Sequence, residues 1–322
     1  MAAEASLTDE LTALEEAAGW VPVSGDSLVR VAGPGHREAL QRVVSQDILG
    51  IPDGQSALAL LLAPKGQFQA IMAVFPGAAE CWLLTPPGRA AEVAVRLSRY
   101  LRLSRCTAEA VPLAGGLEVL GTDWAVEAAA AGADPAVLAR GGWQQAGAVT
   151  WFGRTLAGIS GAVGVAREPA ALVAAEARLG GVARLSAEAV RIARIRVGWP
   201  EWGAELTEAV LPPEAGIEGE TISFTKGCYI GQETIARLRT YGHPNRSLVG
   251  LHQVAGGDDP PALPVALHAA GEEKVRGSVT SWARHPERGG VALALVRREQ
   301  AEPGTTLAGA GRTFVVAPFP LW

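Results

Sequence analysis

The sequence predicts an α+β protein in which two mixed helix–strand lobes are followed by a small β-barrel. The chain has 322 residues, enough for two or three domains with cores of their own. Strand-like and helix-like stretches alternate twice before Asn245. Beyond Asn245 the helical periodicity disappears, and short apolar runs alternate with Gly, Pro and Asp turns, as in a barrel of about five or six strands.

The first lobe is expected to combine helices with a hairpin and a third strand. Residues 37–48 place Leu40, Val43, Val44 and Ile48 on one stripe, which predicts an amphipathic helix. A Pro64-Lys65-Gly66 turn separates two apolar runs and predicts a hairpin. The expected strands are 56–63, 67–75 and 81–85, and a helix is expected over 89–101.

The second lobe repeats this mixture and leads into the barrel. Ser186 and Glu188 predict the start of a helix that continues to about residue 196. The other elements are expected at 117–120 and 149–152 (strands) and at 124–131, 135–140 and 169–178 (helices). Barrel strands are expected at 248–253, 264–268, 275–282, 290–296 and 313–317. We therefore predict two domains, residues 1–243 and 244–322.

Composition argues against several classes of function. The net charge of −5 disfavours a broad nucleic-acid surface. Cys81, Cys106 and Cys228 are odd in number and widely spaced, which fits a reducing cytoplasm and not a disulfide framework. Three cysteines cannot alone hold a four-thiolate cluster, and no histidine pair has zinc-ligand spacing, so we expect no metal site within the chain.

Targeting and nucleotide-binding signals are absent from the sequence. Residues 1–16 are acidic and lack a basic segment, so no signal peptide is expected. Each long apolar run is interrupted by a charge or a breaker, and no membrane span is expected. Neither a Gly-rich dinucleotide fingerprint nor a P-loop is present, which argues against a dinucleotide or nucleoside-triphosphate site.

A cluster of rare residue types marks the stretch 226–245. It holds one of three cysteines, two of three tyrosines and one of the three lysines, among 28 basic residues. Lys226 and a helix start at Gly231 flank Cys228, so we expect a partly ionised, reactive thiol there, with Lys226 as its charged partner. Gly227 and Gly231 would shape a loop that presents the sulfur. The alternative is a small buried cysteine beside an ordinary turn.

The motif K-G-C-Y-x-G-Q-E, followed by a basic segment and H-P-x-R-x-L, resembles the signature of the YgfZ family. These proteins are relatives of the glycine-cleavage aminomethyltransferase and are described as folate-binding proteins that support iron–sulfur clusters in other enzymes. The resemblance extends over the whole chain. It implies a GcvT-like fold, with two ferredoxin-like α+β lobes around a central folate-binding opening and a C-terminal barrel. Implied partners are tetrahydrofolate and iron–sulfur client or assembly proteins.

The resemblance also implies site residues. Glu205 is expected at the pterin edge of the folate, Trp199 or Trp202 at the wall of its ring, and Arg246 near its glutamate tail. Further expected contacts come from the motif itself: Tyr229, Gly227, Gly231, Gln232 and Glu233. Core packing of the two tryptophans and a solvated surface position for the arginine are the alternatives.

One departure from the related aminomethyltransferases affects the expected reaction. Those enzymes carry a carboxylate on the strand after the hairpin, whereas Gln69 and Ala70 stand at the matching positions here. Without that group, methylene transfer loses its proton-handling or charge-stabilising partner. We therefore expect an accessory factor with a functional Cys228, and keep two alternatives: a folate-dependent aminomethyltransferase or demethylase, and a non-catalytic module with RNA or protein partners.

Overall fold

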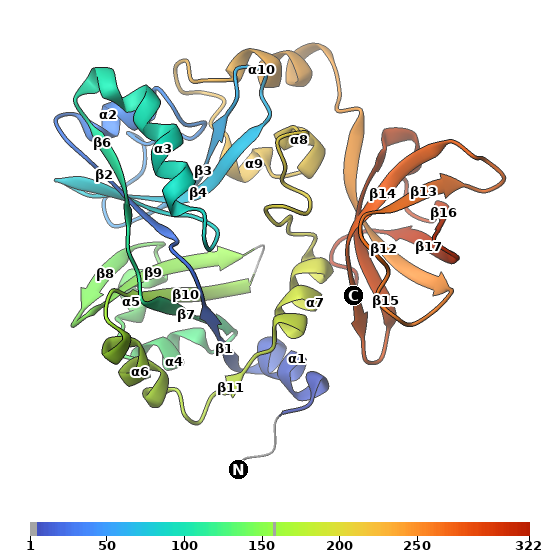
Figure 1. Ribbon diagram of the computed structural model, residues 1–322, viewed down its shortest axis with the longest axis horizontal. Coiled ribbons are helices and arrows are strands. Elements are labelled where there is room, and N and C mark those ends of the chain that lie inside the picture. The colour runs from blue at the N-terminus through green and yellow to red at the C-terminus, as the bar shows by residue number, and fades with distance from the viewer. Residues whose placement is uncertain (1–4, 157–158) are drawn as a thin grey trace.

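The computed structural model describes residues 5–156 and 159–322, which form two sheet-based lobes and a barrel (Figure 1). The two sheets lie one above the other, and the barrel stands to one side of them. Helix α7 and a segment with short helices connect the lobes to the barrel. The predicted architecture of two α+β lobes followed by a barrel is confirmed.

The first lobe is a five-stranded antiparallel sheet in the order β3-β4-β5-β2-β6. One face packs under α3 around apolar side chains such as Leu61, Leu83 and Leu97. The hairpin and the helix over 89–101 appear close to their expected positions. The elements are β2 (Leu28–Ala32), α2 (His36–Gln41), β3 (Ala57–Leu62), β4 (Phe68–Pro76), β5 (Glu80–Leu84), α3 (Ala90–Leu101), η1 (Arg102–Ser104) and β6 (Thr107–Val111).

The helix predicted over 37–48 is wrong beyond Gln41, where α2 ends. The chain continues as turns because its backbone groups bind distant partners. The Ser45 amide donates to the Leu60 carbonyl at 3.0 Å, and the carbonyls on either side of Ser45 accept from Lys226. The four stripe residues are nevertheless buried. Apolar spacing therefore predicted burial here correctly and predicted the backbone conformation incorrectly.

The second lobe contains a six-stranded sheet in the order β11-β1-β7-β10-β9-β8. Strand β1 precedes the first lobe in the chain and pairs with β7 after it, so the two lobes are interleaved. The expected Ser186 cap is present, because its side chain accepts from the Ala189 amide. The elements are α1 (Leu7–Glu16), β1 (Ala18–Val23), β7 (Gly115–Gly121), α4 (Trp124–Ala130), α5 (Pro135–Leu138), β8 (Trp143–Ala146), β9 (Val149–Leu156), β10 (Ile159–Ala166), α6 (Pro169–Arg178), β11 (Ala183–Arg184) and α7 (Ala187–Val197).

The last part of the chain is a closed six-stranded barrel in the order β12-β15-β14-β13-β16-β17. Strand β16 is the barrel strand that the apolar runs did not indicate. Helix α7 packs on the barrel through Ile192 and Ile195. The barrel begins at Arg246, and the division into domains after residue 243 stays a prediction. The elements are α8 (Pro212–Ala215), α9 (Glu218–Thr221), α10 (Gln232–Tyr241), β12 (Arg246–Ala255), β13 (Val265–Ala269), β14 (Val275–His285), β15 (Gly289–Arg297), η2 (Arg298–Gln300), β16 (Thr306–Gly309) and β17 (Arg312–Ala317).

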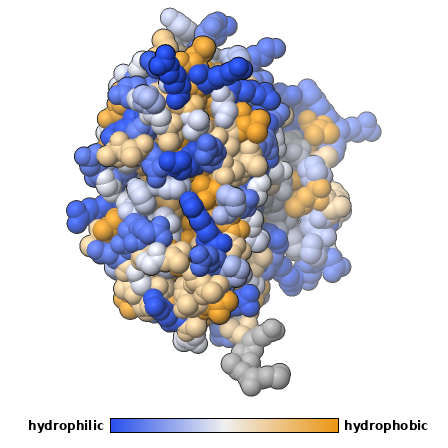
Figure 2. All heavy atoms as spheres, turned by 60° about the vertical axis from the view of Figure 1, so that its left-hand side comes forward, coloured by the Kyte–Doolittle hydropathy of each residue, from blue (hydrophilic) through white to orange (hydrophobic). Residues whose placement is uncertain are grey.

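On the face shown in Figure 2, hydrophobic side chains form small groups separated by hydrophilic ones. Within the described part of the chain, none of the helices combines the length and the apolar character that crossing a membrane requires.

Candidate functional site

The loop that follows α9 is anchored to the first lobe by Lys226. Its Nζ donates hydrogen bonds to the carbonyls of Gln41, Val44 and Gln46 at 2.5, 2.6 and 2.9 Å. The side chain is buried, and burial lowers the pKa of its ammonium to about 8, with the nearby Asp47 acting in the opposite direction. An ammonium has three N–H bonds, and all three are used here. Lys226 therefore holds the loop in place and has no donor left for a sulfur.

Two further residues fix the loop on the other side of the cysteine. Tyr229 is buried in the cluster that covers β3 and β4, and burial raises the pKa of its phenol to about 12. Gly231 has φ +83°, and a Cβ atom there would lie 2.5 Å from the Ala63 carbonyl oxygen. Only glycine fits such a close approach in the left-handed region without strain. This is a position at which the motif requires its glycine.

Cys228 lies between these anchors and is exposed. A Cβ atom on the neighbouring Gly227 would meet nothing within 4 Å, so the space around this part of the loop is open. Cys81 and Cys106 are buried, and burial raises the pKa of both thiols. The alternative of a buried Cys228 is therefore wrong. Among the described residues, no three His, Cys, Asp or Glu side chains come together as a metal site.

Helix α10 begins at Gln232, with Gly231 as its N-cap residue directly after the thiol loop, close to the helix start expected from the sequence. Gln232 is half-buried, and Glu233 is exposed and pairs with Arg237 at 2.7 Å. The Arg239 guanidinium stacks on the exposed ring of Phe224 at 3.7 Å. These arginines have partners within the chain, which weakens the idea of a free basic patch for RNA.

Glu205 is fully buried between α7 and the barrel. Its Oε2 accepts from Arg194 and from the Glu201 amide, each at 3.0 Å. Its Oε1 accepts from Thr280 and Ser281, each at 2.6 Å. A carboxylate offers about four acceptor sites, and all of them are occupied. Glu205 thus joins the lobes to the barrel, and the expected role at the pterin edge finds no free acceptor.

The remaining expected ligand contacts are divided between packing and open surface. Trp199 is buried in the same cluster as Tyr229, whereas Trp202 is half-buried and lies under Arg89, whose guanidinium carbon is 4.4 Å from the indole centroid. Arg246 donates to both carboxylate oxygens of Glu214, at 2.9 and 2.8 Å. Trp202 is therefore the expected wall residue that keeps access to solvent, and Arg246 serves as a structural link.

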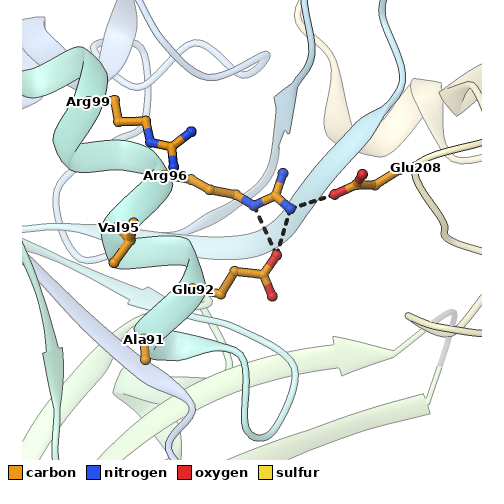
Figure 3. A pocket seen from close by; sticks show the side chains of 6 residues that line it. All are labelled: Ala91, Glu92, Val95, Arg96, Arg99 and Glu208. Atoms are coloured by element: carbon orange, nitrogen blue, oxygen red, sulfur yellow. Dashed lines mark hydrogen bonds and ion pairs between the residues drawn. The ribbon is translucent and has the colours of Figure 1, made fainter.

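A hollow of about 620 Å³ lies between α3 and the loop that carries Glu208 (Figure 3). Arg96 crosses it and donates to Glu92 and Glu208, while Arg99 lies one turn further along the helix without a salt-bridge partner among the described residues. The apolar part of the lining comes from Ala91 and Val95. Arg89 pairs with Glu92 at 2.6 Å and so connects the hollow to Trp202.

Sequence reasoning missed this hollow. Glu92, Arg96 and Arg99 look like ordinary solvent-facing helix charges, and Glu208 lies far away in the sequence. Strand β4 carries Gln69, which is half-buried, and Ala70, which is buried.

Comparisons with known proteins agree on the architecture. No family model matches the chain. The chain is 38% identical over 120 residues to an aminomethyltransferase of Streptomyces coelicolor, covering 36% of this chain and 31% of that protein. It is 34% identical over 91 residues to the tRNA-modifying protein YgfZ of Serratia proteamaculans, covering 28% of each. These matches thus span about a third or less of the relatives' own lengths.

The likeness to a solved structure extends much further. Aminomethyltransferase T of the glycine cleavage system from Bartonella henselae superposes with a TM-score of 0.87 at 21% identity, over 98% of this chain and 90% of that one. At this identity the superposition establishes the fold and leaves the activity open. The chain therefore has the aminomethyltransferase fold, including its C-terminal barrel.

Proposed function

We propose that this chain is a tetrahydrofolate-binding accessory protein for the assembly or repair of iron–sulfur enzymes, and that it acts through Cys228. The observation that carries the proposal is the thiol loop, in which Lys226, Tyr229 and Gly231 are fixed while Cys228 is exposed. A sulfur presented in this way can meet a large partner without rearrangement of the fold. The partial likeness to a YgfZ protein and the aminomethyltransferase fold support the same reading.

The folate is proposed to bind at the hollow beside α3. A pterin with its glutamate tail needs an apolar slot, a carboxylate for the ring edge and a cation for the tail. Val95 supplies an apolar wall, Glu208 supplies a carboxylate, and Arg99 supplies the cation. Glu205 and Arg246 do not fit these roles, because their polar atoms are already bound within the chain. The folate would supply a one-carbon carrier at this site.

Cys228 supplies the chemistry of this chain. A thiolate can bind iron or attack an electrophilic sulfur of a partner, and exposure gives it access to both. Since all three N–H bonds of the Lys226 ammonium donate to backbone carbonyls, the lysine positions the cysteine loop and does not donate a proton to the sulfur or its partner. In our proposal Lys226 therefore positions the loop, and does not act as the charged partner of Cys228 that the sequence predicted.

The test uses cells that lack the native protein. Cys228→Ala and Thr225→Ala are expressed at equal levels, and the activity of a cluster-containing enzyme is measured. Thr225 is an exposed loop neighbour, so its variant controls for a surface change near the thiol. We expect loss of enzyme activity with Cys228→Ala and full activity with Thr225→Ala. Full restoration by Cys228→Ala would remove the thiol from the mechanism.

A folate-dependent aminomethyltransferase is the second candidate, favoured by the relatives that carry this name and by the fold. The absence of a carboxylate at Gln69 and Ala70 argues against it. Purified protein is incubated with an aminomethyl donor and tetrahydrofolate, and methylene transfer is followed. We expect no turnover, and turnover would rank this candidate first.

A further inference from the structure

A second hollow, of about 290 Å³, lies where the two lobes meet. Its floor is apolar and comes from both sheets: Leu28 and Trp82 belong to the first lobe, and Val165 to the second. All three side chains are buried members of the cluster that joins the sheets. The volume lies just below the range of about 300–1,000 Å³ found for small-molecule sites. The hollow therefore suits a small ligand with an apolar body.

The rim of this hollow carries polar and charged groups. Thr150 donates to the Gln145 side-chain oxygen at 2.6 Å, which fixes that side of the rim. Arg167 and Glu168 line another side and are exposed. Across the described ranges 5–156 and 159–322, neither side chain has a salt-bridge partner within 4.0 Å. Glu168 precedes α6 and makes no capping hydrogen bond with its side chain.

The indole of Trp82 also carries a polar group without a partner. Its Nε1–H is buried and has no hydrogen-bond acceptor within the described part of the chain. An unpaired buried donor destabilises the folded state. The edge of the Trp82 ring packs against Trp143, with the ring centroids 5.9 Å apart, and this contact holds the floor of the hollow in place.

We propose that this hollow binds a zwitterionic α-amino acid with an aromatic or large apolar side chain. The ligand's carboxylate pairs with Arg167, its ammonium pairs with Glu168, and its side chain lies on the floor formed by Trp82, Leu28 and Val165. One cation and one anion on consecutive residues match the two charges of a free amino acid, which a simple acid or amine does not offer. Because the floor comes from both sheets, the ligand would also stabilise the contact between the lobes. This site is independent of Cys228 and of the α3 hollow.

The test is calorimetric titration of the full chain with L-phenylalanine, 3-phenylpropionate and phenethylamine. The first analogue lacks the ammonium and the second lacks the carboxylate. We expect L-phenylalanine to bind, and each analogue to bind about tenfold more weakly or worse because it loses one charge-assisted contact. Equal binding of the three compounds, or absence of binding by L-phenylalanine, would overturn the proposal.

Variants locate the binding at this hollow. Arg167→Met and Glu168→Gln are surface changes and should each weaken L-phenylalanine binding about tenfold. Ala148→Trp places a large ring at the exposed rim and should block entry. Lys65→Met, at the tip of the distant hairpin, is the control and should leave the affinity unchanged. Unchanged affinity in Arg167→Met together with Ala148→Trp would place the ligand elsewhere and refute the site.

Discussion

Replacement of Lys226 by methionine tests whether the thiol loop is held as the structure indicates. The change keeps an unbranched apolar chain and removes the ammonium that binds three carbonyls. Each carbonyl left without a buried partner costs about 1–3 kcal/mol. The lowered pKa of the Lys226 ammonium, about 8, corresponds to a cost of about 3 kcal/mol for burying its charge, which the variant recovers. Three such carbonyls together cost about 6 kcal/mol, so the net loss of stability is about 3 kcal/mol.

Native-state hydrogen exchange measures this loss where it occurs. Amides of residues 42–46 and 223–231 should exchange roughly 150-fold faster in Lys226→Met, since about 3 kcal/mol corresponds to that ratio. Lys65→Met is a matched control, because Lys65 is also followed by glycine but is exposed at the tip of the hairpin. It should leave exchange in the loop unchanged. Equal exchange rates in Lys226→Met and the natural chain would refute the anchoring role.

The remaining predictions concern the other anchors and the link to the barrel. Because burial raises the pKa of Tyr229 to about 12, the folded state favours the neutral phenol. The resulting contribution to stability, about 3 kcal/mol, is complete below pH of about 10 and is lost as the pH rises through 12. Tyr229→Phe should abolish this alkaline decrease in urea unfolding, and an unchanged slope would assign it to another group. Gly231→Ala should destabilise the protein by about 2 kcal/mol or more, through strain at φ +83° and contact with a carbonyl oxygen, whereas Gly227→Ala has open space and should have little effect. Glu205→Ala should cost about 3–5 kcal/mol because it removes the buried carboxylate that pairs with the buried Arg194, and Glu201→Ala, which removes an exposed carboxylate from the same arginine, should cost under about 1 kcal/mol in the same assay.

The sequence correctly predicted the structural elements that are determined by residues close together in the chain. The Pro64-Lys65-Gly66 turn and the Ser186 cap depend on residues a few positions apart, and both are found. The prediction of a helix over 37–48 was wrong because carbonyls of this segment accept hydrogen bonds from Lys226, some 180 positions away in the sequence. Apolar spacing on one segment carries no information about such a partner.

The same limit applies to the candidate site. The rarity of residue types around Cys228 located the loop, and the fold explains why Gly231 is needed there. The carboxylate oxygens of Glu205 accept hydrogen bonds from Arg194, Thr280 and Ser281, which only the folded chain brings together. For this reason the sequence named the residue without revealing that its oxygens are already bound.

Equilibrium binding of tetrahydrofolate tests most directly whether this thiol protein also has a folate site. The purified chain is titrated under anaerobic conditions, beside Arg99→Met and Cys228→Ser. Our account predicts binding at micromolar concentrations or below, weakened by Arg99→Met and unchanged by Cys228→Ser, because the hollow beside α3 and the thiol loop are formed by different residues. Absence of binding at micromolar tetrahydrofolate would contradict the folate part of the proposal and leave only the exposed thiol.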